Sequence, residues 1–385
     1  MERQPLLAGA GIALVGYTSS FAVVLAGLRA VGADESQATS GLVAVSATTA
    51  IGTLWLSRRY RRPLTLAWST PGAAVLASAA VPSGGWAAAV GAFLVTGVLI
   101  VLTGSVPALA GLIQRIPAPI AQAMLAGVVL ELCLAPVTAL RVHPWQVAPI
   151  LLTWLLLARV APRWAVPAAF AVLLVVVGVD LGRDGGVSGP WLPHPTWTTP
   201  HLTLAAVDSI ALPLYVVTMA AQNVPGVAIL KSFGFEVPWR TAMAVTGLGT
   251  VVGAPLGGHA INLAAISAAV PASAEAHPDP ERRWPAASAF GGTFVVLAVL
   301  STPLVSYLSA APTAVVASVA GVGLLGTLGT ALAGAVADPA DRTAPVVTFV
   351  VAASGFTVAG IGPAFWALVA GLVVHAALRL PVSAR

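Results

Sequence analysis

The sequence predicts an all-α polytopic membrane protein with fourteen membrane-spanning segments in two inverted repeats of seven. Three observations lead to this fold class. The 385 residues are 58% hydrophobic and 8% charged, whereas a soluble domain carries about 25% charged residues. Apolar runs long enough to cross a bilayer recur from one end of the chain to the other. Two of these runs, one half-chain apart, are broken in the middle by proline and glycine.

Each predicted span is a run of roughly 20 mainly apolar residues. In chain order the spans cover residues 5–28, 37–57, 63–81, 86–105, 117–137, 144–160, 163–181, 203–228, 238–252, 255–271, 285–308, 312–335, 343–360 and 362–380. Residues 30–33 look like a signal-peptide cleavage site, but the apolar run before them is longer than the usual run of about 7–15 residues. We therefore expect an uncleaved first span.

The positions of the basic residues support this span count. With the N-terminus inside, fifteen of the 18 Lys and Arg residues fall on one side of the membrane, and only Arg29, Arg141 and Arg183 fall on the other. Positively charged loops are retained in the cytoplasm, so we expect a multi-pass protein of a bacterial cytoplasmic (inner) membrane with both termini in the cytoplasm. The net charge of +5 then reflects topology and requires no nucleic-acid partner.

A polar connection at about residues 182–202 divides the spans into seven and seven. Repeat one is about 1–182 and repeat two about 203–385, within one membrane unit covering 1–385 and without a soluble domain. An odd number of spans in each repeat gives the two repeats opposite orientations, as in many secondary transporters. The two broken segments are then the third span of each repeat.

These broken spans contain Trp68-Ser69-Thr70-Pro71-Gly72 and the glycine-rich run 253–262. A helix is interrupted at membrane depth only where the freed backbone groups are satisfied, and a matched pair of breaks indicates a transporter's binding site. We expect extended stretches at 66–70 and 254–258, each followed by a half-helix whose start attracts an anion. The alternative is a Pro/Gly kink with ordinary packing. The candidate binding residues at the breaks are Trp68, Ser69, Thr70, Gly72, Gly258, His259 and Asn262.

Spans 8 and 1 supply further candidates. In span 8, Gln222 and Asn223 either hydrogen-bond substrate or cap backbone freed by Pro225. In span 1, the run Tyr17-Thr18-Ser19-Ser20-Phe21 places Tyr17, Ser20 and Phe21 in a polar and aromatic patch, although such hydroxyls are also tolerated facing lipid. Trp68 adjoins the break and is expected to form one wall of a flat slot for an aromatic ligand.

Ionisable groups inside the spans are few, and such groups are functional candidates by default. Glu131 is the deepest acid and His259 the titratable group best placed for the cavity, so both are candidates for proton coupling. The alternative for Glu131 is a helix–helix hydrogen bond, and His375 is expected to be a packing residue. We expect neither an enzyme nor a bound cofactor, because the sequence contains no catalytic motif and no metal-ligand cluster. The Gly321–Gly326 run is expected to allow close helix packing.

At residues 66–74 and 257–266 the chain resembles the benzoate membrane transport proteins, the bacterial benzoate/proton symporter family. The likeness extends over essentially the whole length. The resemblance implies the seven-plus-seven inverted repeat of uracil permeases and sulfate transporters, with spans 1–4 and 8–11 as a core domain and spans 5–7 and 12–14 as a gate. Nucleobase permeases carry an acid on span 8, where this chain has neutral Gln222 and Asn223. An acid there would repel a carboxylate.

The resulting hypothesis is secondary active import of benzoate or a related aromatic carboxylate together with protons. The carboxylate would lie at the half-helix starts and the ring between Trp68, Tyr17 and Phe21. A nucleobase or inorganic-anion permease of the same fold is the main alternative, and a channel, a membrane-embedded enzyme or a permease subunit driven by a separate ATPase are further ones. The sequence does not fix the oligomeric state, and a homodimer is one state that it allows.

Overall fold

The computed structural model describes residues 3–184, 189–358 and 361–379. Eight of its described helices are long and apolar enough to cross a membrane, and α7, α16 and α17 are shorter apolar helices. Together with α12 and the two broken segments, these elements account for the fourteen predicted spans. The protein is thus a helical, multi-pass membrane protein, with only two short strands among the described residues.

The elements of the first repeat, in chain order, are α1 (Arg3–Ala30), α2 (Glu35–Tyr60), β1 (Leu66–Trp68), α3 (Thr70–Ala77), α4 (Gly85–Ser105), α5 (Pro107–Gln114), α6 (Ala118–Val142), α7 (Pro144–Val160), η1 (Pro162–Trp164) and α8 (Ala165–Asp184). Helix α5 lies between predicted spans 4 and 5, where no helix was expected. Pro107 occupies its first turn, a position where the missing proline N–H costs no hydrogen bond.

The elements of the second repeat are α9 (Leu204–Ala206), η2 (Val207–Ala211), α10 (Leu212–Thr218), η3 (Met219–Asn223), α11 (Val224–Ser232), α12 (Trp239–Gly253), η4 (Ala254–Leu256), β2 (Ile261–Leu263), η5 (Ile266–Ala268), α13 (Ala269–Ala272), η6 (Pro280–Arg282), α14 (Trp284–Leu308), α15 (Thr313–Ala335), η7 (Pro339–Asp341), α16 (Thr343–Ala353) and α17 (Pro363–Arg379). Each repeat therefore carries its strand in its third span.

Local sequence explains several of these boundaries. Helix α2 begins with a capping box, in which the Asp34 side chain accepts from the Gln37 amide and the Gln37 side chain accepts from the Asp34 amide. It ends where Arg61 adopts a left-handed conformation with φ of 48°.

Span 8 is not a uniform α-helix, because η2 and η3 are π-helical turns. Such turns are rare and frequently occur at functional sites.

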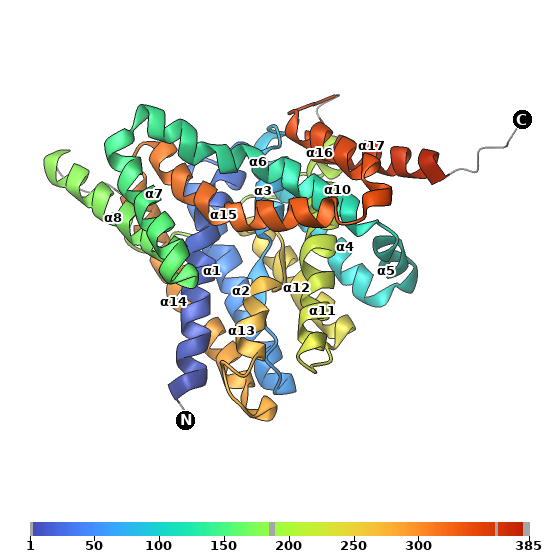
Figure 1. Cartoon of the computed structure of the whole chain (residues 1–385), viewed down its shortest axis with the longest axis horizontal. Helices are drawn as coiled ribbons and strands as arrows, with labels where there is room; N and C mark the ends of the chain where they lie inside the picture. Colours follow the sequence, from blue (N-terminus) through green and yellow to red (C-terminus); the bar gives the residue numbers. More distant parts are fainter. Residues whose placement is uncertain (1–2, 185–188, 359–360, 380–385) are drawn as a thin grey trace, which may run out of the picture.

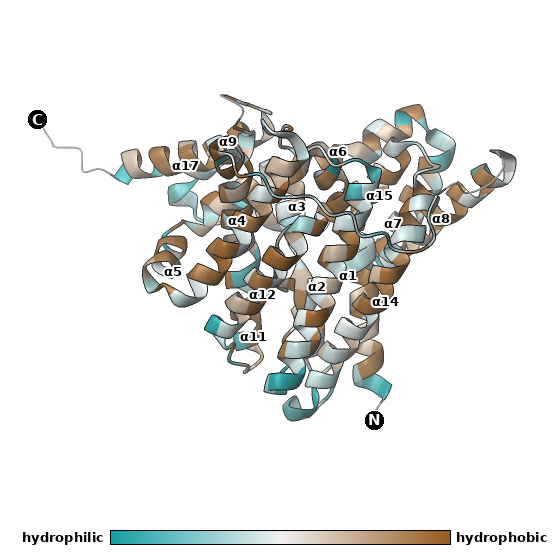
Figure 2. Ribbon diagram, turned by 180° about the vertical axis from the view of Figure 1, so that it is seen from behind, coloured by the Kyte–Doolittle hydropathy of each residue, from teal (hydrophilic) through white to brown (hydrophobic). Residues whose placement is uncertain are grey.

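Most helix contacts fall within two sets, which are joined by α1 on α15 and by α3 on α6 (Figure 1). In one set α2 packs on α14, α4 on α12, and α1 on both α14 and α3; in the other, α6 packs on α15 and α16, and α16 on α17. Hydrophobic residues extend along the outer helices, while hydrophilic residues gather near chain ends and loops (Figure 2). The large side chains exposed on the outer helices include Ile51, Leu155 and Val175, as a lipid-facing surface requires. The division into a core and a gate follows these two sets and stays a prediction.

Candidate functional site

The two broken spans cross as a short antiparallel ribbon. Strand β1 pairs with β2, with Leu66 opposite Leu263, Ala67 opposite Asn262 and Trp68 opposite Ile261. This pairing satisfies backbone groups that an interrupted helix leaves free at membrane depth. The expected extended stretch at 66–70 is confirmed in part by β1, which covers 66–68.

The second extended stretch lies later in the chain than predicted. Residues 254–256 form a 3₁₀ turn, Gly257 follows with φ of 87°, and the extended residues are 261–263. The expectation of an extended 254–258 is therefore wrong. The reason is that pairing with β1, from the other repeat, determines where the chain extends, and such pairing is a long-range contact that local Gly and Pro signals do not report.

The first half-helix starts at one end of this ribbon. Ser69 caps α3, because its Oγ accepts from the Gly72 amide at 3.1 Å, and its own amide donates to the Ala260 carbonyl at 2.8 Å. Thr218 of span 8 donates to the same Ser69 Oγ at 2.8 Å. Thr70, the first residue of α3, is half-buried. Residues from spans 3, 8 and 10 thus meet where the positive end of α3 lies.

His259 and Asn262 are buried at the crossing with polar atoms left over. His259 Nε2 lies 3.2 Å from the Ser69 carbonyl, and Asn262 Nδ2 donates to the Leu263 carbonyl at 2.7 Å. His259 Nδ1 and Asn262 Oδ1 make no hydrogen bond within the described chain. Buried polar atoms are seldom left unpaired, so these two atoms are available to a ligand or to water.

Span 8 contributes two neighbouring polar side chains, Asn223 and Gln222. Asn223 is buried, its Oδ1 accepts from the Leu263 amide at 2.8 Å, and its Nδ2 contacts the Met219 sulfur at 3.2 Å. Gln222 is half-buried beside it. Asn223 holds strand β2 in place, and its expected role in substrate binding stays a prediction. Gln222 remains a candidate for direct substrate contact.

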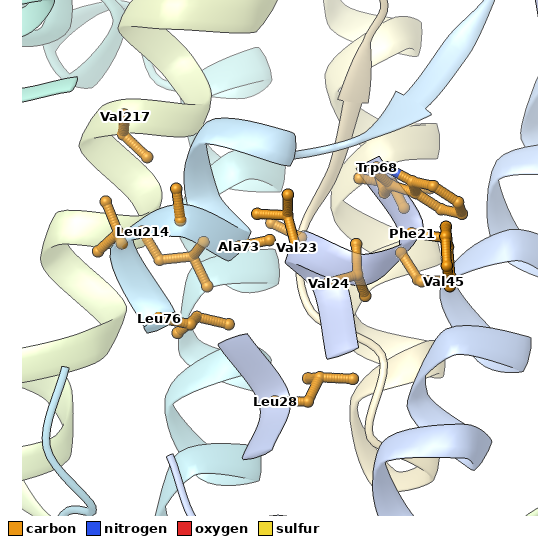
Figure 3. Close-up of a cluster of buried hydrophobic side chains, with 14 of the residues drawn as sticks. Phe21, Val23, Val24, Leu28, Val45, Trp68, Ala73, Leu76, Leu214 and Val217 are labelled. Atoms are coloured by element: carbon orange, nitrogen blue, oxygen red, sulfur yellow. The ribbon is translucent and has the colours of Figure 1, made fainter. Parts of the chain in front are cut away.

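The expected aromatic slot is occupied by its own rings. Tyr17 and Phe21 stack at a centroid distance of 5.9 Å, and Trp68 lies 5.2 Å from Tyr17. All three are at most 3% exposed. Trp68 is oriented by a 2.8 Å hydrogen bond from its Nε1 to Ser20 Oγ. Figure 3 shows Trp68 beside Phe21 at the edge of the apolar cluster that joins α1, α3 and α10. In this conformation the Tyr17 ring therefore lies against both Phe21 and Trp68.

Two predicted glycines serve packing at the crossing. A Cβ on Gly72 would collide with a Leu214 side-chain carbon and with Ser69 Oγ, and a Cβ on Gly258 would lie 3.1 Å from the Gly253 carbonyl oxygen. The Gly258 amide donates to that same carbonyl at 2.9 Å. Gly72 therefore has no room for a side chain, and at Gly258 a side chain would press on neighbouring backbone.

Glu131 lies apart from the crossing. It is exposed in a cavity of about 400 Å³ that is also lined by Ala77 and Ser78, at the C-terminal end of α3. The crossing lies at the other end of this eight-residue helix, about 12 Å away at 1.5 Å per residue. The two predicted proton-coupling groups, Glu131 and His259, are thus not neighbours.

His375 and the glycine run of α15 both contact neighbouring elements. His375 Nδ1 lies 3.2 Å from Asp341 Oδ2, and Arg379 contacts the same oxygen at 3.3 Å, so His375 holds the end of α17 against η7. In the glycine run of α15, Gly321 packs on α6 and Gly323 lies against the Ser19 carbonyl of α1. Close packing at these two glycines is confirmed.

Sequence comparison identifies the family. A sequence model of the benzoate membrane transport protein family matches residues 1–377. The chain belongs to the benzoate membrane transport protein family. This family member is 38% identical over 377 residues to the inner membrane protein YdcO of Escherichia coli, covering 97% of this chain and 96% of YdcO. It is 27% identical over 380 residues to the benzoate membrane transport protein of Acinetobacter baylyi, covering 97% and 95%.

Solved structures confirm the fold of this benzoate transport family member. The transmembrane domain of the cyanobacterial bicarbonate transporter BicA superposes with a TM-score of 0.64 at 15% identity, covering 97% of this chain and 98% of that domain. The murine anion transporter Slc26a9, in its inward-facing state, superposes with a TM-score of 0.63 at 15% identity, covering 98% of this chain and 68% of that one. The seven-plus-seven inverted repeat is thereby confirmed, and the protein is a membrane transporter, not an enzyme.

Span 11 contributes residues that the sequence analysis did not identify. Ser301 Oγ lies 2.7 Å from the Tyr17 hydroxyl, and Phe294 packs on both Trp68 and Tyr17 at 5.4 and 6.2 Å. Phe290 stacks on Phe294 at 4.9 Å. The spacing of positions 290, 294 and 301 places them on one face of a helix. This periodicity is the feature of the sequence that could have identified them as neighbours.

Proposed function

We propose that this protein imports benzoate or a related aromatic carboxylate together with protons across the bacterial cytoplasmic membrane, with both termini in the cytoplasm. The observation that carries this proposal is the crossing itself. Two broken spans meet where His259 Nδ1 and Asn262 Oδ1 have no hydrogen-bond partner among the described residues, in a chain of the benzoate membrane transport protein family. The names of the Acinetobacter baylyi and Escherichia coli relatives support the substrate and the membrane, respectively.

The carboxylate binds at the start of α3, beside Thr70 and His259. The first amides of a helix point outward and carry roughly half a positive charge, so this end suits an anion. The second half-helix begins at η5, beyond the Leu66–Leu263 end of the ribbon, so its start lies at the opposite end from Thr70. Among these residues none carries a negative charge that would oppose a carboxylate, and Gln222 adds a neutral donor.

The aromatic ring of the substrate packs against Trp68. Because Tyr17 and Phe21 fill the space beside Trp68 in this conformation, binding requires these rings to move apart. Aromatic pairs contribute about 0.5–1.5 kcal/mol beyond their buried area, and an incoming ring replaces some of those contacts. Selectivity for an aromatic acid over an inorganic anion follows from this exchange.

Spans 1–4 and 8–11 act as a core that carries the crossing, and spans 5–7 and 12–14 act as a gate. Glu131 lies on α6 of the gate and His259 in the core, and one of them takes the coupled proton. An ionisable group inside the membrane that faces a cavity is suited to a proton relay. Glu131 is exposed to such a cavity, whereas His259 contacts the crossing directly.

The proposal is tested with purified protein in liposomes. We expect radiolabelled benzoate to accumulate when the interior is made alkaline, without ATP, and unlabelled benzoate to compete while uracil and sulfate do not. His259→Ala and Asn262→Ala should each abolish uptake. His194→Ala is the matched control, because His194 is exposed in the connection between the repeats and should transport as the parent does.

Three results would contradict specific parts of the proposal. Uptake that ignores the pH gradient would remove the coupling to protons. Competition by uracil or sulfate, but not by benzoate, would assign the protein to a nucleobase or inorganic-anion permease. Unchanged uptake in both His259→Ala and Asn262→Ala would place the substrate elsewhere in the fold.

A further inference from the structure

A second cavity lies next to the Glu131 cavity, at the C-terminal end of α1. Its volume is about 380 Å³ and its walls come from α1, α6, α14 and α15, helices that lie together in Figure 1. Small-molecule sites occupy roughly 300–1,000 Å³ and are mostly apolar, with a few polar groups. The lining fits this pattern, because Leu25, Leu308 and Val316 form apolar walls around two charged side chains.

The two charged side chains differ in their contacts. Glu35 accepts a hydrogen bond from Ser309 Oγ and lies in the first turn of α2, where the helix dipole stabilises a carboxylate. Arg29 is exposed and makes neither an ion pair nor a side-chain hydrogen bond with the described residues. The cavity therefore presents the Arg29 guanidinium, without a side-chain partner among the described residues, beside apolar walls and the Ser309-bonded Glu35 carboxylate.

The position of Arg29 is not explained by membrane topology. Positive residues hold loops in the cytoplasm, but Arg29 is one of only three basic residues predicted on the opposite side. A basic residue on that side, inside a cavity between packed helices, calls for another role. A guanidinium binds a carboxylate through two parallel hydrogen bonds.

We infer that this cavity is an outer binding site for a small aromatic carboxylate, which it holds before the crossing opens. The Arg29 guanidinium binds the carboxylate, and the ring lies against Leu25, Leu308 and Val316. Ala26 and Leu132 line both this cavity and the Glu131 cavity, so the two adjoin. This inference rests on the proposed function for the identity of the ligand.

Thiol protection tests occupancy of the cavity. Cys133 is the only cysteine, so a Cys133→Ala background allows a single reporter thiol to be introduced by Ala317→Cys, on the cavity wall. We expect benzoate to slow labelling of this thiol by a membrane-impermeant reagent at least fivefold, and neutral benzamide to have no effect. Arg29→Gln should remove the protection. Val142→Cys is the control, because Val142 is 70% exposed at the end of α6, outside the lining, and its labelling should ignore benzoate.

Transport provides a second measurement. Arg29→Gln should raise the benzoate concentration for half-maximal uptake at least tenfold, Arg29→Lys should raise it less, and Arg141→Gln should leave it unchanged. Protection that persists in Arg29→Gln, or protection by benzamide equal to that by benzoate, would overturn the inference, because a lipid acyl chain or apolar contact alone would then explain the site.

The failure of this inference is distinct from the failure of the proposed function. If the parent accumulates benzoate but the Ala317→Cys thiol is never protected, the outer site is wrong and the transport proposal stands. If the thiol is protected through Arg29 while no benzoate accumulates, the outer site stands and the transport proposal is wrong.

Discussion

Gln222→Glu tests whether the substrate's carboxylate binds beside span 8. The two side chains have the same shape, and Gln222 is half-buried in the π-helical turn η3, so the variant changes one charge with little change in packing. For two negative charges about 5 Å apart, at an effective dielectric constant of about 20, Coulomb repulsion is about 3 kcal/mol. We therefore expect benzoate to bind about 100-fold more weakly, since each 1.4 kcal/mol is tenfold.

The assay is the concentration dependence of benzoate uptake, with benzoate-induced thermal stabilisation of the purified variant as a check on binding. Gln37→Glu is the matched control. Gln37 is also half-buried, and glutamate serves the same capping box, so its half-saturation should stay within about twofold of the parent, as expected for a screened charge near the surface. If Gln222→Glu is folded and its half-saturation is also within twofold, the carboxylate does not bind beside span 8.

Three other variants address the braces of the site and its coupling. Asn223→Leu leaves the buried Leu263 amide without its acceptor and should cost about 1–3 kcal/mol, measured as a lower thermal unfolding temperature in detergent; equal stability would show that the brace is dispensable. Ser20→Ala should cost a similar amount, because the buried Trp68 indole N–H loses its acceptor, and tryptophan fluorescence should change with it; an unchanged spectrum would count against this orientation. Glu131→Gln should abolish the stimulation of uptake by an alkaline interior while benzoate counterflow continues, and stimulation that persists would exclude Glu131 as the proton carrier.

The sequence predicted the spans well because bilayer thickness and charge retention act on local composition. A run of about 20 apolar residues is long enough to cross the membrane, and the predicted placement of fifteen basic residues on one side supports the predicted alternation of the spans. The position of the second strand could not be obtained in this way. Gly257 signals a break, but Ile261 is extended because Trp68 lies opposite it, and no local pattern encodes a partner almost 200 residues away.

The candidate site was predicted by residue type, but not by role. Tyr17 and Trp68 lie together as expected, yet their rings fill the slot that they were expected to line, and Phe294 and Ser301 from span 11 contact them there; their role in substrate binding stays a prediction. Asn223 was expected to bind substrate or cap its own helix, and it braces a strand from another span. These roles depend on contacts between distant segments, which a single sequence does not report.

The two ends of α1 lie in different surroundings. The Arg29 cavity opens at its C-terminal end. At its N-terminal end, Gln4 donates to the Glu275 carbonyl, and the Glu275 side chain pairs at 2.8 Å with Arg163 from the connection between α7 and α8. This pair joins one predicted gate segment to one predicted core segment, so we expect it to break when those two segments move apart. Its side chains are 70% and 54% exposed, and such pairs contribute only about 0–1 kcal/mol, so we expect the pair to break at little cost in free energy.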